Sequence, residues 1–412
     1  MTRPIHVWFE DGVEKGAQVR RLIFEGHEGE GISRAESWWR IFGVTDLSVP
    51  PVLDSFVSGH VLWAAMNGQD LRVHGPMSHG GLYNMGQLIE IRSVLSPEMY
   101  PRRISVIPDQ VVTVARPADD PGLAVAALSG GLDSTFTAVR HARRLVGAAA
   151  FRLAGLVMVH GFDAPIDRAD QFDEMRRRAE PLAQWLELPI YTVATNAKLT
   201  GGRAWPQAAI PLTACALAQF SDRCAVGLVS AGAPHGIPRF GISHGGFLDA
   251  LSSNDFFQVV TDGGGFGRAD KIEALSCFPQ ALAALKVCWE GPDPARNCGH
   301  CQKCVLTRLN FLAAGLPDPP CFETPLELAH IERLDLPSMY VARDLFRLCW
   351  NELESRGRTG PAVDLLRRRL ARVPPNDHVP AALRRVGWLT RRLVPAKARH
   401  VIRRHLPAWL RL

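Results

Sequence analysis

The strongest constraint on the fold is a regular alternation within residues 123–231. Short, largely apolar runs of strand length, at 123–128, 153–160, 189–194 and 225–231, are separated by segments with helical periodicity. Strands that are apolar on both faces are typical of a parallel sheet with helices packed on each side. The sequence therefore predicts an α/β domain with a parallel sheet and helices on both faces.

The remainder of the chain divides around this region. Residues 1–118 predict a separate N-terminal α/β module, because runs such as 5–9 alternate like strands. The segment 116–122 is polar and rich in Pro and Asp, which predicts a linker. The central domain is predicted to span 122–316, and residues 317–412 to form a helical, basic extension.

The sharpest local feature stands where the first of these apolar runs ends and a helix begins. Two adjacent glycines permit positive φ and remove side chains that would block an approaching phosphate. The helix that follows would direct its N–H groups and the positive end of its dipole at the same place. Hydroxyl groups add donors, and Asp133 is placed to hold a Mg²⁺ ion that bridges the phosphates. The predicted nucleotide-binding loop consists of Ser129, Gly130, Gly131, Leu132, Asp133, Ser134 and Thr135.

Two other nucleotide-binding loops are excluded, because the chain has neither G-x-x-x-x-G-K-[ST] nor a G-x-G-x-x-G that opens a helix after a strand. The string Ser-Gly-Gly-x-Asp-Ser resembles the PP-loop of the N-type ATP pyrophosphatases. These include asparagine synthetase, GMP synthetase, NAD synthetase, tRNA thiolation enzymes and 7-cyano-7-deazaguanine synthase. The resemblance implies that ATP is cleaved between its α- and β-phosphates, giving pyrophosphate and an adenylated substrate from which ammonia or a sulfur donor displaces AMP.

Four of the nine cysteines are clustered, as Cys288, Cys298, Cys301 and Cys304. The odd total, the tight spacing and an N-terminus without a secretory signal favour reduced thiols and a metal site over disulfides. Four thiolates at this spacing predict a closed, tetrahedral Zn²⁺ site. Iron–sulfur ligation also uses two-residue spacings, but zinc is favoured because the fourth ligand lies upstream and no redox partner is apparent. His300 is predicted to lie beside the metal rather than bind it.

The two motifs together resemble a narrower family. A PP-loop followed by a late four-cysteine cluster is similar to 7-cyano-7-deazaguanine synthase, and the segments 288–291 and 297–304 look like that family's cysteine segment. The resemblance covers residues 122–316 and implies that the metal braces the C-terminal part of the catalytic domain. Because both ends are unmatched, we expect an outlying member that serves another pathway, in natural-product, nucleobase or defence chemistry.

Further site residues are predicted around the loop. The glycine-rich stretch 241–271 is expected to close over the ATP phosphates. Arg268 and Lys271, at the start of the next helix, would neutralise charge that develops on departing pyrophosphate, although exposed loop cations are the alternative. Gly161 follows the apolar run 153–160, where the backbone of a related fold would contact adenine; an ordinary turn is the alternative.

The net charge of +6 is unevenly distributed. Residues 351–412 contain 15 Lys and Arg against 4 Asp and Glu, so the rest of the chain is mildly acidic. This tail predicts short basic amphipathic helices that bind RNA phosphates, an anionic membrane surface or an acidic protein, or that simply cap the enzyme. No apolar run is long enough to cross a membrane, and a cytoplasmic location is expected.

Three functions follow from these patterns. The first is an AMP-forming ligase that uses ATP, Mg²⁺ and a structural Zn²⁺, and that adenylates a carboxylate or amide oxygen for attack by ammonia or an amine. The second is a tRNA-modifying enzyme that adenylates a base and holds RNA with its basic tail. The third is a non-catalytic nucleotide-binding subunit, against which the intact Asp133 argues.

Overall fold

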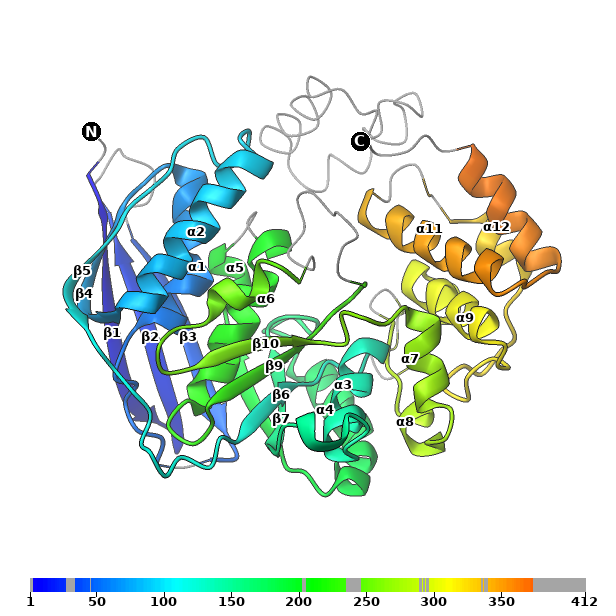
Figure 1. Cartoon of the computed structure of the whole chain (residues 1–412), viewed down its shortest axis with the longest axis horizontal. Helices are drawn as coiled ribbons and strands as arrows, with labels where there is room; N and C mark the ends of the chain where they lie inside the picture. Colours follow the sequence, from blue (N-terminus) through cyan, green and yellow to red (C-terminus); the bar gives the residue numbers. More distant parts are fainter. Residues whose placement is uncertain are drawn as a thin grey trace. The chain divides into compact units, whose positions relative to one another are not determined.

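The chain forms two compact units in a computed structural model (Figure 1). The first unit comprises Met1–Gly267 and Glu273–Lys286, and the second comprises Arg268–Ile272 and Val287–Leu412. The residues that the structure describes are 3–26, 34–44, 46–201, 205–234, 246–288, 291, 293, 296–334, 336 and 340–372.

The strands of the first unit form one ten-stranded sheet in the order β10-β9-β6-β7-β8-β3-β2-β1-β4-β5. Strands β6 to β10 pair in parallel, as do β1, β4 and β5, whereas β2 and β3 run antiparallel to their neighbours. The predicted α/β class with a mostly parallel sheet is confirmed. The strands are β1 (Ile5–Glu14), β2 (Ala17–Glu25), β3 (Arg34–Phe42), β4 (Leu71–Ser78), β5 (Val106–Val112), β6 (Ala124–Ala127), β7 (Leu153–His160), β8 (Ile190–Thr195), β9 (Val226–Ser230) and β10 (Gln258–Asp262).

Helices connect most of these strands. The α-helices of the first unit are α1 (Asp54–Asn67), α2 (His79–Leu95), α3 (Leu132–Ala142), α4 (Ala169–Leu186), α5 (Ala197–Gly201), α6 (Trp205–Leu217) and α8 (Pro279–Ala283). Its 3₁₀ helices are η1 (Gly147–Ala149), η3 (Ala218–Phe220) and η5 (Asp249–Ser252). The division between the units falls within α7 (Arg268–Leu275). The second unit contains α9 (Gln302–Ala314), α10 (Leu328–Glu332), α11 (Tyr340–Ser355) and α12 (Pro361–Ala371).

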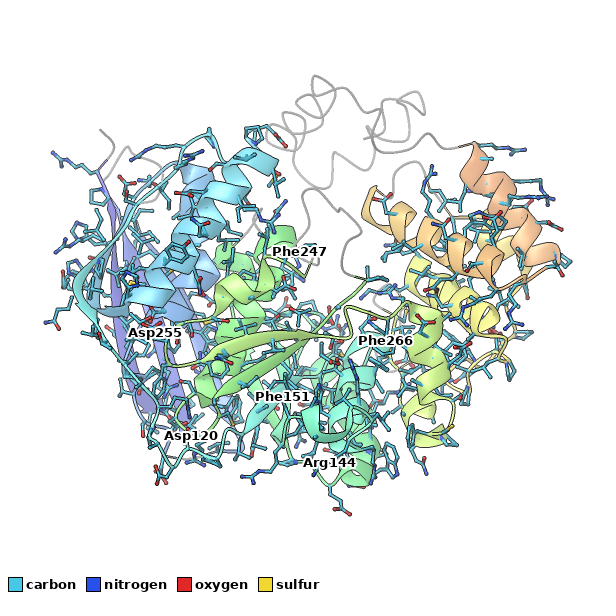
Figure 2. The ribbon with its side chains drawn as sticks, viewed as in Figure 1. Asp120, Arg144, Phe151, Phe247, Asp255 and Phe266 are labelled. Atoms are coloured by element: carbon cyan, nitrogen blue, oxygen red, sulfur yellow. The ribbon has the colours of Figure 1, made fainter. Side chains whose placement is uncertain are left out.

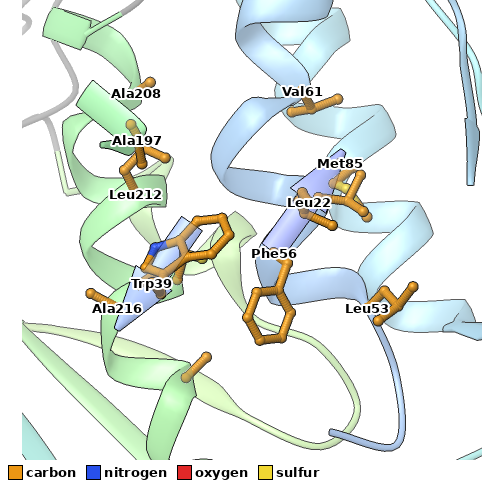
Figure 3. Close-up of a cluster of buried hydrophobic side chains, with 14 of the residues drawn as sticks. Leu22, Trp39, Leu53, Phe56, Val61, Met85, Ala197, Ala208, Leu212 and Ala216 are labelled. Carbon is orange, nitrogen blue, oxygen red and sulfur yellow. The ribbon is translucent and has the colours of Figure 1, made fainter. Parts of the chain in front are cut away.

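The main hydrophobic core lies on one face of the sheet. Helices α1, α2 and α6 fill it, and alternate strand residues such as Val125, Val157 and Val193 project into the same cluster. Figure 3 shows Trp39 and Phe56 within this core, between the helices of the N-terminal region and α6. Helices α3 and α4 cover the other face of the parallel strands (Figure 1), which explains why those strands are apolar on both sides.

The sheet runs without interruption from the N-terminal region into the parallel strands. β3 pairs antiparallel with β8, with Trp39 opposite Thr195, so residues before the 116–122 linker share a sheet with residues after it. The linker itself contains no helix or strand. The predicted domain boundaries at 118 and 316 stay predictions.

Strand directions determine which ends of the elements meet. β4 runs parallel to β1, and three successive antiparallel pairings separate β1 from β8, so β4 runs opposite to β8 and its parallel neighbours. The edge at which β6 to β10 end is therefore the edge at which β4 begins. Because α2 follows β4 and returns along it, the C-terminal turn of α2 also lies at this edge.

Candidate functional site

The predicted phosphate loop is a tight turn at the C-terminal end of β6. Gly130 has φ +78° and is followed by Gly131 in an extended conformation as the N-cap of α3. The N-cap residue is a glycine, so no side chain of the cap accepts a hydrogen bond from the first turn of α3. The backbone N–H groups of that turn therefore do not have to exchange a capping side chain for a ligand. Parallel strands flank β6 on both sides. In sheets of this kind ligands lie beyond the carboxyl ends of the strands, at such a turn.

Side chains within the loop brace the turn. The Ser134 hydroxyl lies 3.1 Å from that of Ser129 and accepts from the Ser129 amide at 3.2 Å. The Leu132 side chain is 5% exposed and Thr135 is fully buried, with its Oγ1 unpartnered among the described residues. Asp133 is half-buried at the first turn of α3. Ser134 thus holds the turn through its hydrogen bonds, whereas the side chain of Asp133 is partly exposed to solvent.

Lys286 is a neighbour of the loop that the sequence analysis missed. Its backbone amide donates to the Gly130 carbonyl at 2.8 Å, and its Cβ is 3.4 Å from where a side chain on Gly130 would begin. The residue is 8% exposed. A cationic side chain thus starts directly against the glycine turn. No motif marks this lysine, because its proximity to residue 130 depends on how the chain returns after more than 150 residues.

Asp262 fixes the orientation of α3. Its carboxylate accepts from Thr137 Oγ1 at 2.9 Å and from Arg140 at 2.8 Å. Burial opposes its ionisation, but His141 and Arg140 prevail and hold the pKa of Asp262 below its usual range. Phe266, labelled in Figure 2, packs on Phe136 of the same helix. The helix that begins at the loop is therefore anchored to the end of β10.

Gly161 has a steric reason to be glycine. Its φ is +112°, and a Cβ there would lie 1.9 Å from the Thr195 carbonyl oxygen at the end of β8. Such an approach leaves no room for any side chain. Packing between neighbouring strand ends thus accounts for this residue, and its predicted contact with a nucleotide stays a prediction.

Arg268 and Lys271 belong to the second unit. Arg268 is the first residue of α7, and its charge acts on Glu352 of α11, whose side chain also accepts from the Ala269 amide at 3.2 Å. Lys271 is 1% exposed, so the alternative of an exposed loop cation does not hold for it. The approach of either residue to the phosphate loop, which lies in the first unit, stays a prediction. Residues 241–245 of the expected closing segment lie outside the described residues.

The four clustered cysteines converge as the spacing predicted. The sulfur atoms of Cys288, Cys298, Cys301 and Cys304 all lie within 4.8 Å of one another. Adjacent sulfurs are 3.4 to 3.9 Å apart. Four ligands around one Zn²⁺ with Zn–S bonds of about 2.3 Å would place them about 3.8 Å apart. The geometry suits a single tetrahedral ion, and the sulfurs are too close together to enclose a four-iron cluster.

Backbone groups and an amide side chain support this centre. The Gly291 amide lies 3.3 Å from Cys288 Sγ, and the Cys301 amide lies 3.3 Å from Cys298 Sγ. Asn297 Oδ1 accepts from the amides of Val287 and Cys288 at 2.9 and 3.1 Å. The Gly291 and Cys301 amides would stabilise thiolate ligands directly, and Asn297 holds the backbone that carries Cys288.

In the absence of a cation, the clustered thiols favour their protonated forms. Hydrogen bonding with Cys288 raises the pKa of Cys301 to about 12 and also raises the pKa of Cys304. A divalent ion reverses that tendency, because it binds thiolates. The exposed His300 ring bonds the Cys298 carbonyl at 2.8 Å, as expected for a residue beside the metal rather than a ligand.

The described part of the tail is helical, and some of its side chains pack or form hydrogen bonds within the second unit. Val363, Leu366 and Leu370 of α12 are buried, and Arg369 donates to the carbonyls of Glu332 and Leu334. The basic helices predicted beyond residue 372 lie outside the described residues. Within the described chain, no helix combines the length and apolar character needed to span a bilayer.

Comparison with known proteins gives one local similarity. A stretch of 38 residues is 45% identical to 7-cyano-7-deazaguanine synthase of Cupriavidus metallidurans, and it spans 9% of this chain and 17% of that enzyme. No family model matches the chain, and no solved structure matches it. The chain is therefore similar to a deazaguanine synthase over a small fraction of either length.

Proposed function

We propose that this protein is an ATP-dependent, AMP-forming ligase of the PP-loop type, which adenylates a carboxylate or amide oxygen for attack by ammonia or an amine. The observation that carries the proposal is the turn between β6 and α3. It combines a positive-φ glycine, a helix N-terminus without a side-chain cap and a position at the carboxyl edge of parallel strands. The local similarity to a deazaguanine synthase supports the same reaction class.

The proposed reaction has two steps. The acceptor oxygen attacks the α-phosphorus of ATP, the bond to the β-phosphate oxygen breaks, and pyrophosphate leaves. Ammonia or an amine then attacks the adenylated carbon, and AMP departs with the acceptor oxygen. The loop serves the first step, because backbone N–H groups and a helix dipole stabilise negative charge on the leaving pyrophosphate.

Four side chains have proposed roles in that step. Asp133 would hold the Mg²⁺ that accompanies ATP. Lys286, which starts against Gly130, would neutralise charge on the β- and γ-phosphates. Arg268 and Lys271 are proposed to add to this neutralisation when the phosphates are bound. The four cysteines would hold Zn²⁺ as a structural ion, because a site with four protein ligands has no open position for catalysis.

Product analysis tests the proposal. Full-length protein is incubated with ATP, Mg²⁺, ammonium and fractionated small-molecule extract, and the nucleotide products are separated. The proposal requires AMP and pyrophosphate in equal amounts. Formation of ADP and phosphate would assign a different reaction, and nucleotide binding without turnover in any fraction would favour the non-catalytic subunit.

The tRNA-modifying alternative has no specific support among the described residues. In α12, Arg369 is used to cap neighbouring carbonyls and Arg367 lies 3.5 Å from Asp364. An RNA or acidic-protein partner for the tail stays a prediction. Deleting residues 373–412 and measuring RNA that co-purifies with the protein would test it.

A further inference from the structure

A cluster of buried polar groups lies at the phosphate-loop edge of the sheet, on the face opposite α3. Arg92, in the last turn of α2, is 2% exposed, and its Nε has no hydrogen-bond partner among the described residues. Tyr100 is 1% exposed, and its hydroxyl is likewise unpartnered in the described chain. The two side chains are close enough to interact electrostatically.

The parallel strands contribute the other side of this cluster. Asp249 on η5 is 3% exposed, interacts electrostatically with Arg92, and accepts from Thr261 Oγ1 of β10 at 3.0 Å. Ser252, three residues further on this 3₁₀ helix and therefore on the same side of it, is 1% exposed and has an Oγ without a partner in the described residues. Three unmatched donors thus come from separate segments.

Position distinguishes this cluster from the nucleotide loop. Asp262 of β10 faces α3, so its neighbour Thr261, which holds Asp249, faces the opposite side of the sheet. β10 lies two strands from β6, which is about 10 Å at ordinary strand spacing. The unmatched groups are therefore near the loop but do not form part of it.

A purely structural role explains these groups poorly. A buried donor without a partner is destabilising, and a buried guanidinium more so. Arg20 provides the contrast within the same unit. Its Nε also lacks a hydrogen bond, but its two terminal nitrogens donate to the carbonyls of Gln219 and Ser48. The Arg92 guanidinium has no hydrogen bond to a described residue at any of its nitrogens, so a bound group with acceptor oxygens would complete its hydrogen bonding.

We propose that Arg92, Tyr100 and Ser252 form a binding site for the carboxylate group of a small molecule. A planar carboxylate matches the fork of a guanidinium and leaves lone pairs for two hydroxyl donors. Asp249 offsets part of the guanidinium charge, so the site suits a carboxylate monoanion better than a phosphate dianion. Burial raises the pKa of Tyr100, which keeps its hydroxyl a donor. The site stands whether or not the chain turns over ATP.

Acetate is the probe for this site. Thermal unfolding of the full-length protein and ¹³C line widths of labelled acetate are measured as acetate replaces chloride at constant ionic strength. Acetate should raise the unfolding temperature of the wild type, and Arg92→Met should weaken that binding by about tenfold or more. Tyr100→Phe should weaken it by a smaller factor, and phosphate should be a poorer ligand than acetate.

Two controls separate ligand binding from folding. Arg20→Met removes a partnered buried guanidinium and should lower the unfolding temperature, whereas Arg92→Met should leave it unchanged or raise it. Arg92→Met should also retain ATP binding, so failure here is distinguishable from failure of the ligase proposal. An equal acetate response in wild type and Arg92→Met, no response in either, or destabilisation by Arg92→Met as large as that by Arg20→Met would overturn the site.

Discussion

The phosphate loop and the cysteine centre are built on opposite principles. In the loop the backbone itself forms the proposed binding surface, and the side chains of Leu132, Ser134 and Thr135 are buried beneath the turn. In the cysteine centre the side chains themselves converge, with sulfurs 3.4 to 3.9 Å apart, and the backbone amides assist. We therefore expect a single substitution in the loop to reduce function and a single substitution in the cysteine centre to impair folding.

The largest expected effect is at the cysteine centre. Cys301→Ala removes one of the four thiols of the proposed zinc site. Because binding of such an ion is coupled to folding, we expect metal loss and a fall in the free energy of unfolding on the order of 5 kcal/mol. Metal content and thermal unfolding measure this. The exposed Cys277 is the matched control, and Cys277→Ala should change neither. Equal metal content and equal unfolding temperature in the two variants would contradict a metal site at these cysteines.

The next effect separates function from folding at the loop. Asp133→Ala should reduce AMP formation by about 10³-fold, because a group that holds charge in the transition state is lost. Its free energy of unfolding should fall by only about 1 kcal/mol, the usual size of the interaction between a carboxylate and a helix N-terminus. Asp170, exposed in the first turn of α4, is the control, and Asp170→Ala should remain active. Full activity in Asp133→Ala would contradict the proposed role.

Gly130→Ala tests whether the turn needs its backbone conformation. An alanine at φ +78° costs about 1–2 kcal/mol, and its Cβ would press on Lys286 at 3.4 Å. We expect about tenfold weaker ATP binding, measured by calorimetry. Gly122→Ala is the matched control, because φ there is +63° but nothing lies within 4 Å. If both variants bind ATP like the wild type, the turn is not the nucleotide site.

The last effect concerns the pH dependence of stability in the first unit. Burial raises the pKa of Asp54 to about 7. A carboxyl whose folded-state pKa exceeds its unfolded value binds protons more tightly when folded, so stability should fall as pH rises from about 4 to 7. Each unit of pKa shift corresponds to about 1.4 kcal/mol.

Denaturant unfolding at several pH values measures that dependence. Asp54→Asn should flatten the pH dependence of first-unit unfolding, while metal-dependent unfolding of the second unit should be unaffected. An unchanged slope in Asp54→Asn would show that another group causes it.

Much of the fold followed from local patterns. The run 153–160 coincides with β7, and the segment of helical periodicity after it contains α4 at Ala169–Leu186. β3 was missed because its outward residues are charged or aromatic and hide the apolar alternation. β4 was missed because Gly75 and Pro76 interrupt it at a register shift. β10 was missed because it lies within a glycine-rich stretch that suggested a loop.

The site was predictable only where residue type and spacing determine the chemistry. Cys298, Cys301 and Cys304 follow one another at two-residue spacings, so their convergence could be read directly. Lys286 could not be found, because its position beside Gly130 is a tertiary contact. Arg92 and Tyr100 gave no signal for the same reason: their role depends on which donors remain unmatched after folding.

The most direct test of the central claim is the fate of ATP labelled at its α-phosphate. Full-length protein is given this ATP with Mg²⁺, ammonium and fractions of small-molecule extract, and the labelled products are separated. The account predicts labelled AMP, with an equal amount of unlabelled pyrophosphate, and none of it with Asp133→Ala. Labelled ADP, or equal AMP formation by Asp133→Ala, would contradict it.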